Sequence, residues 1–331
     1  MNTLRTIDAH VAGSAVRVVT GGCPAPRGRT MQDKRQWAAT RLDSLRRTIM
    51  LEPRGHADLG GAVLTEPVTP GADAGVLFMD GRGFPSLSGH GLMAVSAVAV
   101  ARGLVLPRQP HRLVFDTAAG PVRVEYGLGD LSGGSRFRVS GVPSFVLHPG
   151  VECSIPGRRL RADVAYGGAF YAIVDAESAG VPVDGAYLGA LRGTGVLVAA
   201  AVESALTIEH PVAGMPGGLA GVVFTAPPRV DGAALRSAVV RVHGAVERSP
   251  SGTATAAMMA VLDAMGLLIQ RVPFVHESLI GQTFEGQVVG HTVVHGLEAI
   301  LPDVTGEAHI TGEHLFLADA ADPFRAGFQL S

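Results

Sequence analysis

Short runs of β-forming residues recur along the chain and are separated by turn-forming residues. Glycine and proline stand between the runs and are not gathered into one long linker. This spacing is typical of many short elements joined by tight turns. It predicts strands at residues 17–20, 75–79, 113–115, 122–126, 137–139, 169–174, 222–224, 238–242 and 292–294.

Helical patterns are fewer and longer than the strand patterns. We expect helices at residues 31–51, 89–102 and 252–265, with shorter ones within 183–192 and at 232–236. The mixture of strands and helices indicates an α+β or α/β chain with two packed layers in each domain.

One helical segment is repeated. Residues 86–104, SLSGHGLMAVSAVAVARGL, align without a gap with residues 249–267, SPSGTATAAMMAVLDAMGL. Each copy begins with a serine in the N-cap position, Ser88 or Ser251, and ends at a glycine suited to a left-handed C-cap. Both helices are apolar on nearly every side, which is typical of a helix enclosed by a sheet. The repeat predicts two similar domains, related by a pseudo-twofold axis, that each wrap strands around a central helix.

The length and charge of the chain narrow the class of protein. A chain of 331 residues is long enough for two domains, and its formal net charge of −2 argues against a nucleic-acid partner. No apolar run reaches the ~18 residues that cross a bilayer, and the first residues lack the pattern of a signal peptide. The two cysteines, Cys23 and Cys153, form neither a disulfide framework nor a zinc motif. We expect a cytoplasmic protein without a membrane or nucleic-acid partner.

The single lysine and the missing motifs limit the available chemistry. Lys34 lies in a polar stretch that we expect to be exposed, so it is a poor candidate for the buried Schiff base of a pyridoxal phosphate enzyme. The sequence has no P-loop, no glycine-rich dinucleotide fingerprint and no HExxH metal motif. We therefore expect an enzyme that works without a cofactor or a bound metal.

The starts of the two repeated helices are candidate anion sites. The first backbone N–H groups of a helix lack acceptors within it, and the positive end of the helix dipole favours an anion. Gly89 and Gly252 allow a ligand to approach the backbone closely. If the pseudo-twofold axis brings both starts together, they form a pocket for one small carboxylate with Ser88 and Ser251 on opposite sides. That layout suits proton abstraction next to a carboxylate; two simple N-cap serines are the structural alternative.

These residues lie in longer motifs that resemble the proline racemase family. The first family signature, Cys-Gly-His at a helix start, appears as Ser88-Gly89-His90. The second, Asp-Arg-Ser-Pro followed by Cys or Thr and Gly-Thr, appears as ERSPSGT at residues 247–253. The family includes proline racemases, 4-hydroxyproline 2-epimerases and trans-3-hydroxy-L-proline dehydratases. Within a further matching stretch at residues 164–177, the form YGGAFYA resembles the dehydratases.

The resemblance implies a fold similar to diaminopimelate epimerase. Such a fold is an α+β chain of two pseudo-symmetric domains, with the active site in the cleft between them. We expect residues 1–128 together with about 311–331 to form the first domain around helix 89–102. Residues 129–310 then form the second domain around helix 252–265. We also expect a homodimer.

The sequence departs from the family at its reactive positions. Racemases and epimerases of the family use two thiols, whereas this chain has Ser88 and Ser251, and a hydroxyl is a far weaker acid than a thiol. Dehydratases of the family carry Cys and then Thr, so Ser251 is the milder change. Glu247 replaces the aspartate that holds the ring ammonium of the substrate, and Ser14 replaces a common glutamate. Either the enzyme has diverged, or the serines substitute thiols of the natural protein.

The candidate catalytic residues are Ser88, His90 and Ser251. His90 lies in the first helical turn, where the positive helix end favours a neutral imidazole. Such an imidazole can accept a proton from Ser88 or assist a departing hydroxyl. We expect further contacts with the substrate from Gly89, Gly91, Glu247, Gly252, Thr253 and His56.

Three functions are compatible with these residues. The leading hypothesis is a cofactor-independent trans-3-hydroxy-L-proline dehydratase, a hydro-lyase that removes the α-proton and gives Δ1-pyrroline-2-carboxylate and water by syn elimination. The second is an isomerase, either a 4-hydroxyproline 2-epimerase or a proline racemase. The third is a catalytically silent member that only binds a cyclic imino acid, because both usual thiol positions are serine.

Overall fold

A computed structural model describes residues 2–127, 136–269 and 271–329. The chain divides into two compact units, Met1–Val139 with Gly306–Ser331, and Ser140–Thr305. The domain boundary that we expected between residues 128 and 129 lies outside the described residues. The second boundary falls between residues 305 and 306, whereas we expected it near residue 310.

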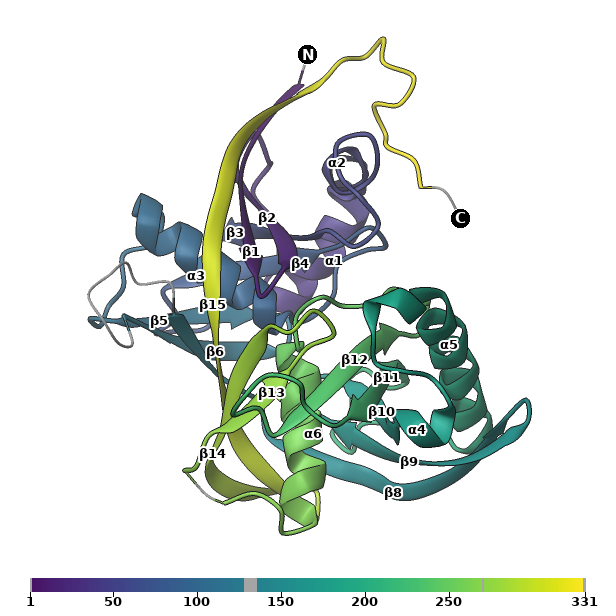
Figure 1. Ribbon diagram of the computed structural model, residues 1–331. Helices are drawn as coiled ribbons and strands as arrows, with labels where there is room; N and C mark the ends of the chain where they lie inside the picture. The colour runs from purple at the N-terminus through teal and green to yellow at the C-terminus, as the bar shows by residue number, and fades with distance from the viewer. Residues whose placement is uncertain (1, 128–135, 270, 330–331) are drawn as a thin grey trace. The chain divides into compact units, whose positions relative to one another are not determined.

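The first unit wraps a sheet around one helix, α3 (Gly89–Arg102). Its strands follow the order of the chain, and the C-terminal part of β15 (Leu297–Ala318) pairs with β1. Helix α3 lies against β1, β2, β3 and β6 (Figure 1). All its residues from Gly91 to Ala99 are buried. The strands are β1 (Asn2–Val11), β2 (Ser14–Gly21), β3 (Gly60–Thr65), β4 (Ala74–Met79), β5 (Arg112–Thr117), β6 (Gly120–Tyr126) and β7 (Arg136–Ser140).

Two further helices, α1 (Met31–Arg41) and α2 (Asp43–Met50), pack on the other side of this sheet. Successive side chains of a strand point to opposite faces. On β4, Leu77 and Met79 therefore join the core of α1 and α2, whereas Phe78 between them lies against α3. Every residue of β4 is buried because helices cover both faces of the strand.

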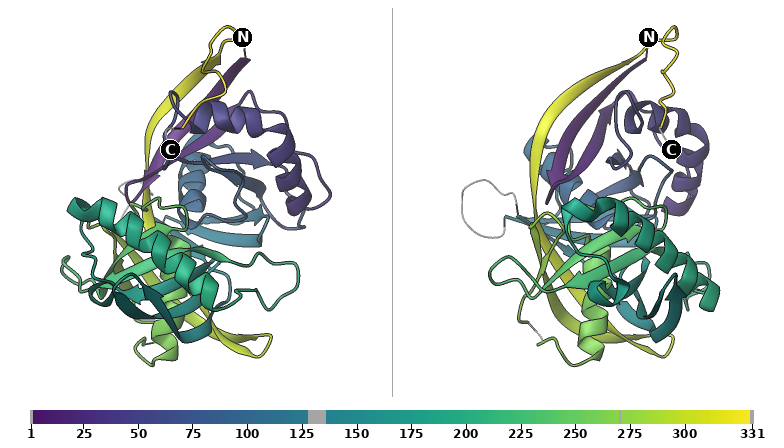
Figure 2. Two further views of the ribbon diagram at one scale, coloured as in Figure 1. Left: turned by 90° about the vertical axis from the view of Figure 1, so that its right-hand side faces the viewer. Right: turned by 45° about the vertical axis from the view of Figure 1, so that its right-hand side comes forward.

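The second unit encloses α6 (Gly252–Ala264) in the same way. Its sheet runs in chain order, with β8 also pairing with the N-terminal part of β15. Helix α6 contacts β8, β9, β10 and β14, and α5 (Leu188–Ala205) lies along the outer face of the strands (Figure 2). The remaining elements are β8 (Ser144–Ile155), β9 (Arg158–Tyr166), β10 (Phe170–Asp175), α4 (Ala176–Ala179), η1 (Gly185–Tyr187), β11 (Leu219–Ala226), β12 (Leu235–Arg241), β13 (Phe274–Glu277) and β14 (Thr283–Val294).

The two units share one topology. In the first, the pairs from β1 to β6 run antiparallel, parallel, antiparallel, parallel and antiparallel. The pairs from β9 to β14 repeat this series. Helix α3 connects β4 to β5, and α6 connects the corresponding β12 to β13. The predicted fold of two similar α+β domains, each with strands around a central helix, is confirmed.

Several predicted elements differ from the structure. The helix expected at residues 31–51 is two helices, because Leu42 leaves helical geometry with φ −108° and ψ 4°. The helix expected at residues 232–236 is wrong: Gly232 takes a turn conformation with φ +79°, and Leu235 begins β12. A five-residue helix closes too few hydrogen bonds to offset the cost of nucleation, so pairing with β11 and β13 prevails.

The short helix expected within residues 183–192 is the start of a longer, apolar helical segment. Residues Gly185–Ala205, formed by η1 and α5, are the single candidate membrane span among the described residues, by length and composition. Core helices of globular proteins can have the same length and composition. Leu191, Val198 and Val202 pack into the core of the second unit, whereas Val196 and Leu197 are exposed.

Candidate active site

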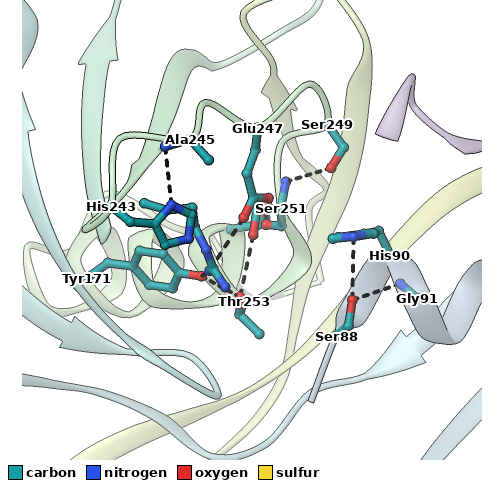
Figure 3. Close-up of polar contacts among 12 residues, drawn as sticks. Ser88, His90, Gly91, Tyr171, His243, Ala245, Glu247, Ser249, Ser251 and Thr253 are labelled. Carbon is teal, nitrogen blue, oxygen red and sulfur yellow. Dashed lines mark hydrogen bonds and ion pairs between the residues drawn. The ribbon is translucent and has the colours of Figure 1, made fainter. Parts of the chain in front are cut away.

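At the start of α3, Ser88 is a side-chain N-cap. Its backbone is extended, with φ −145° and ψ 112°, and its Oγ accepts a hydrogen bond from the N–H of Gly91 at 3.1 Å (Figure 3). The same Oγ lies 3.5 Å from Nε2 of His90. A hydroxyl has one proton and two lone pairs, so the bond from Gly91 leaves the Ser88 proton available to His90. The structure therefore brings together the hydroxyl and the imidazole that the sequence analysis paired.

Gly91 is required by its surroundings. A Cβ at this position would lie 2.9 Å from the ring of Phe78 and 2.8 Å from the Oγ of Ser88. Glycine thus lets the first turn of α3 pack directly on β4. The N–H of Gly91 already donates to the Oγ of Ser88. The expected contact between Gly91 and a substrate stays a prediction. Gly89 is the first residue of α3, where backbone N–H groups have no acceptor within the helix.

His56 lies apart from these contacts, in the exposed turn between α2 and β3. Its Nδ1 accepts a hydrogen bond from the N–H of Asp58 at 3.3 Å. Arg54, two residues before His56, forms an ion pair with Asp322 near the C-terminus. A role for His56 in substrate binding stays a prediction.

The start of α6 has a different geometry. Ser251 has φ 62° and ψ 116°, makes no side-chain cap and is only 3% exposed. A positive φ at a serine costs of the order of 1 kcal/mol or more, and such strain is often found at functional sites. The Oγ of Ser251 lies 3.4 Å from the Oγ1 of Thr253. The hydroxyl of Ser251 therefore contacts the side chain of Thr253 and does not accept a capping hydrogen bond from the first N–H groups of α6.

A buried polar network holds the backbone of Ser251. Its carbonyl accepts from the N–H and from the Oγ1 of Thr255, both at 2.8 Å. The Oγ1 of Thr255 also lies 2.8 Å from Nδ1 of His276, whose Nε2 lies 2.8 Å from the Oγ of Ser237. Since Thr255 has one hydroxyl proton and gives it to Ser251, Nδ1 of His276 carries the ring proton and Ser237 donates to Nε2. Burial lowers the pKa of His276 to about 3, so this imidazole is neutral.

Glu247 lies in the loop that leads to α6. Its Oε1 lies 3.4 Å from Nη1 of Arg241. Its Oε2 is buried and has no hydrogen-bond partner among the described residues. A buried carboxylate oxygen without a partner is costly, and a cationic group of a ligand would offset that cost. This geometry fits the expected role of Glu247 as the acceptor for a ring ammonium.

Two residues that were not predicted from the sequence complete the polar contacts around the start of α6. Tyr171 on β10 is fully buried, and its hydroxyl lies 2.8 Å from the Oγ1 of Thr253. Arg241 at the end of β12 donates to the same hydroxyl at 3.1 Å. A signal for Tyr171 lay in the matched stretch YGGAFYA, but its contact with Thr253 joins positions 82 apart in the chain.

The two helix starts therefore share a serine in the N-cap position but have different neighbouring side chains. Each has a serine hydroxyl with a polar partner two residues later, His90 in one unit and Thr253 in the other. Each also has helix N-terminal N–H groups suited to an anion. Among the described residues, no group of three or more His, Cys, Asp or Glu side chains is placed to hold a metal ion.

Two units of one topology, each with strands around a central helix whose start carries a hydroxyl, define the class of diaminopimelate-epimerase-like proteins. A family model described as proline racemase matches residues 6–329. The chain belongs to the proline racemase family of enzymes.

Individual relatives match over almost the whole chain. A trans-3-hydroxy-L-proline dehydratase of Bacillus cereus is 39% identical over 326 residues, which are 98% of this chain and 97% of the relative. A proline racemase of Clostridioides difficile is 36% identical over 332 residues, covering 99% and 98%. The crystal structure of a hydroxyproline epimerase from Agrobacterium vitis, with bound trans-4-hydroxy-L-proline, has a TM-score of 0.89 and 29% identity, covering 100% of this chain and 95% of that chain.

Proposed function

We propose that the protein is a cofactor-independent trans-3-hydroxy-L-proline dehydratase. The observation that carries this proposal is that the serine hydroxyls at the two helix starts have different polar neighbours. Ser88 has an imidazole beside its hydroxyl, whereas Ser251 has only the hydroxyl of Thr253. Racemisation needs proton-transfer groups on both faces of the α-carbon. A single acid–base pair is sufficient for an elimination on one face.

The stereochemistry of the substrate agrees with this asymmetry. In trans-3-hydroxy-L-proline the hydroxyl lies opposite the carboxylate, so it shares a ring face with the α-hydrogen. The Ser88–His90 pair takes the α-proton, and the electrons of the C–H bond form the double bond between C2 and C3. The C3–O bond then breaks, and the same pair protonates the departing hydroxyl to give water. The first product, Δ2-pyrroline-2-carboxylate, tautomerises to Δ1-pyrroline-2-carboxylate.

Substrate binding in this proposal uses the backbone N–H groups at a helix start. Those near Gly89 or Gly252 bind the carboxylate and stabilise the negative charge that develops on it during proton removal. Glu247, with its unpartnered buried Oε2, binds the ring ammonium. The dehydratase relative at 39% identity supports the choice of reaction.

The alternative is an epimerase or racemase that acts on proline or a hydroxyproline. It is favoured by the presence of a hydroxyl at the same position of both helix starts, and by relatives that are a proline racemase and a hydroxyproline epimerase. In that case Ser251 removes or returns the proton on the second face.

One experiment separates these reactions. The purified protein is incubated in D₂O with trans-3-hydroxy-L-proline, trans-4-hydroxy-L-proline or L-proline, and the α-proton and products are followed by NMR. We expect loss of water from trans-3-hydroxy-L-proline with Ser88→Ala as the inactive control. Exchange with inversion of configuration would identify an epimerase or racemase instead. Binding without any exchange would identify a silent binder, and both results would overturn the dehydratase proposal.

A further inference from the structure

The hydroxyl groups around the start of α6 form a chain that begins at a cation. Nη1 of Arg241 lies 3.1 Å from the hydroxyl of Tyr171, which lies 2.8 Å from the Oγ1 of Thr253. The Oγ1 of Thr253 lies 3.4 Å from the Oγ of Ser251 (Figure 3). All four residues belong to the second unit. The chain therefore links a charge at the end of β12 to the candidate catalytic hydroxyl.

The donors in this chain have a fixed direction. Arginine carries donors only, so the Tyr171 oxygen accepts from Arg241. Tyr171 is fully buried, and its hydroxyl has two partners among the described residues, Arg241 and Thr253. A buried hydroxyl proton without an acceptor is costly, so Tyr171 donates to Thr253. The proton of Thr253 can then be donated to the Oγ of Ser251 at 3.4 Å, which leaves the proton of Ser251 for a ligand.

We propose that Arg241, Tyr171 and Thr253 form a directional hydrogen-bond relay that makes the Ser251 hydroxyl a proton donor to the substrate. Tyr171 and Arg241 are positioning residues in this relay, since they act through Thr253. The identity of the ligand rests on the proposed function, but the direction of the relay does not. Ser251 thereby stabilises the anionic carboxylate and does not serve as a base.

The relay also explains why two matched serines are not interchangeable. The Oγ of Ser88 lies 3.5 Å from Nε2 of His90, so a neutral imidazole with its proton on Nδ1 can accept the proton of Ser88. Ser251 instead receives a hydrogen bond from a relay that starts at a guanidinium, which favours retention of its own proton. One hydroxyl is arranged for proton removal and the other for donation.

The test measures binding of pyrrole-2-carboxylate, a planar mimic of the deprotonated substrate, by titration calorimetry. Tyr171→Phe removes one hydroxyl with little change in packing, and we expect it to raise Kd about tenfold, the scale of one charge-assisted hydrogen bond. Tyr166→Phe is the matched control, because this buried tyrosine packs against Phe145, Phe170 and His210 on the other side of the sheet. Its Kd should equal that of the wild type.

A double-mutant cycle distinguishes the relay from a general loss of structure. In a Ser251→Ala background, Tyr171→Phe should change Kd by less than about twofold, because the relay then has no end to act on. A full tenfold loss in that background would overturn the proposal. A second measurement does not need Ser251→Ala. Thr253→Val should raise Kd as Tyr171→Phe does, whereas Thr253→Ser should keep the Kd of the wild type. Equal affinity of the Val and Ser variants would also overturn the relay.

The outcomes for the relay and for the proposed function are separable. A wild-type protein that binds pyrrole-2-carboxylate but dehydrates no hydroxyproline refutes the function, and the cycle still supports or refutes the relay. A protein that dehydrates its substrate with unchanged affinity in Tyr171→Phe refutes the relay alone. A wild-type protein that does not bind pyrrole-2-carboxylate refutes Ser251 as a donor to that ligand.

Discussion

The starts of α3 and α6 lie in the two copies of one repeated segment, yet their N-cap serines differ in conformation. Ser88 is extended and accepts the N-cap hydrogen bond from Gly91. Ser251 has a positive φ and makes no cap, although the sequence pattern at both positions is Ser-Gly. The N-cap interpretation of a serine before a helix is therefore right for one copy and wrong for the other.

The residues that follow explain the difference. Four positions after the serine, α3 has the apolar Leu92, whereas α6 has Thr255, which binds the carbonyl of Ser251 and contacts His276. Buried polar contacts thus stabilise a strained backbone in α6 that the apolar neighbour in α3 does not support. The comparison teaches that a repeated segment can keep its fold while its two copies take unequal chemical roles.

The largest effect should come from removing the acid–base pair of α3. Ser88→Ala and His90→Ala should each lower kcat/KM at least about 10²-fold, the scale of a general acid or base. Ser251→Ala should keep a measurable fraction of activity, because its hydroxyl only donates. Initial rates with the best substrate give the comparison, and His291→Ala, an exposed imidazole on β14, is the control. If Ser251→Ala is the most damaging variant, the reactive face belongs to α6.

The support of α6 should be sensitive to acid. The pKa of His276 is about 3 in the folded chain, because of burial, and about 6.5 in an unfolded chain. The unfolded state therefore binds one more proton between these values, and the free energy of unfolding falls as the pH drops below about 6.5, by roughly 1.4 kcal/mol per unit.

Urea unfolding at pH 7 and pH 5 measures this dependence. In His276→Asn the imidazole is absent, so the loss of stability between the two pH values should be smaller by about 2 kcal/mol. Other titrating groups cancel in the difference between variant and wild type. An unchanged difference between the two pH values would show that His276 is not the group responsible.

A thiol at the first helix start should accelerate the reaction. Ser88→Cys places a far more acidic group beside His90, and a thiolate is much more populated than an alkoxide near neutral pH. We expect kcat/KM to rise at least about tenfold. Ser251→Cys is the matched variant and should gain less, since no imidazole stands beside it. An unchanged or lower rate in Ser88→Cys would mean that the pocket is adapted to a hydroxyl.

The smallest effects should be two opposite changes in the free energy of unfolding, one at each helix start. Ser251→Gly relieves the positive φ and should raise the free energy of unfolding by about 1 kcal/mol while lowering activity. Ser88→Gly removes a side-chain cap and should cost a few tenths of a kcal/mol. Chemical denaturation of both variants checks the pair. Changes of the same sign would show that the conformational difference carries no strain.

Local signals were enough to predict the central helices. The N-cap serine and terminal glycine placed α3 at residues 89–102, as observed, and α6 ends one residue earlier than expected. The gapless repeat also predicted that both units share one architecture. Most predicted strands were shorter than the observed ones, and β1, β3, β8, β9, β13 and β15 were not predicted as separate strands. In β9 and β15 charged residues alternate with apolar ones because one face is solvated, which hides the strand pattern in a search for apolar runs.

The candidate site could be predicted only as far as its motifs. Ser88, His90 and Ser251 stand in short contiguous signatures. Tyr171 and His276 reach the start of α6 from β10 and β13, and only the pairing of strands distant in sequence brings them there. Local propensity carries no information on such contacts, which depend on register across the sheet.

The glycine turn between β9 and β10 limits how this enzyme can be redesigned. A Cβ at Gly167 would lie 2.3 Å from the carbonyl oxygen of Thr253 and 2.4 Å from the nitrogen of Ala257. The turn therefore touches the backbone of α6 directly, and any larger residue there would push the helix start out of place. A mutant library aimed at new substrates would have to hold residue 167 constant. Ala169, which packs only partly against the core, is the position in this turn where diversity can be introduced.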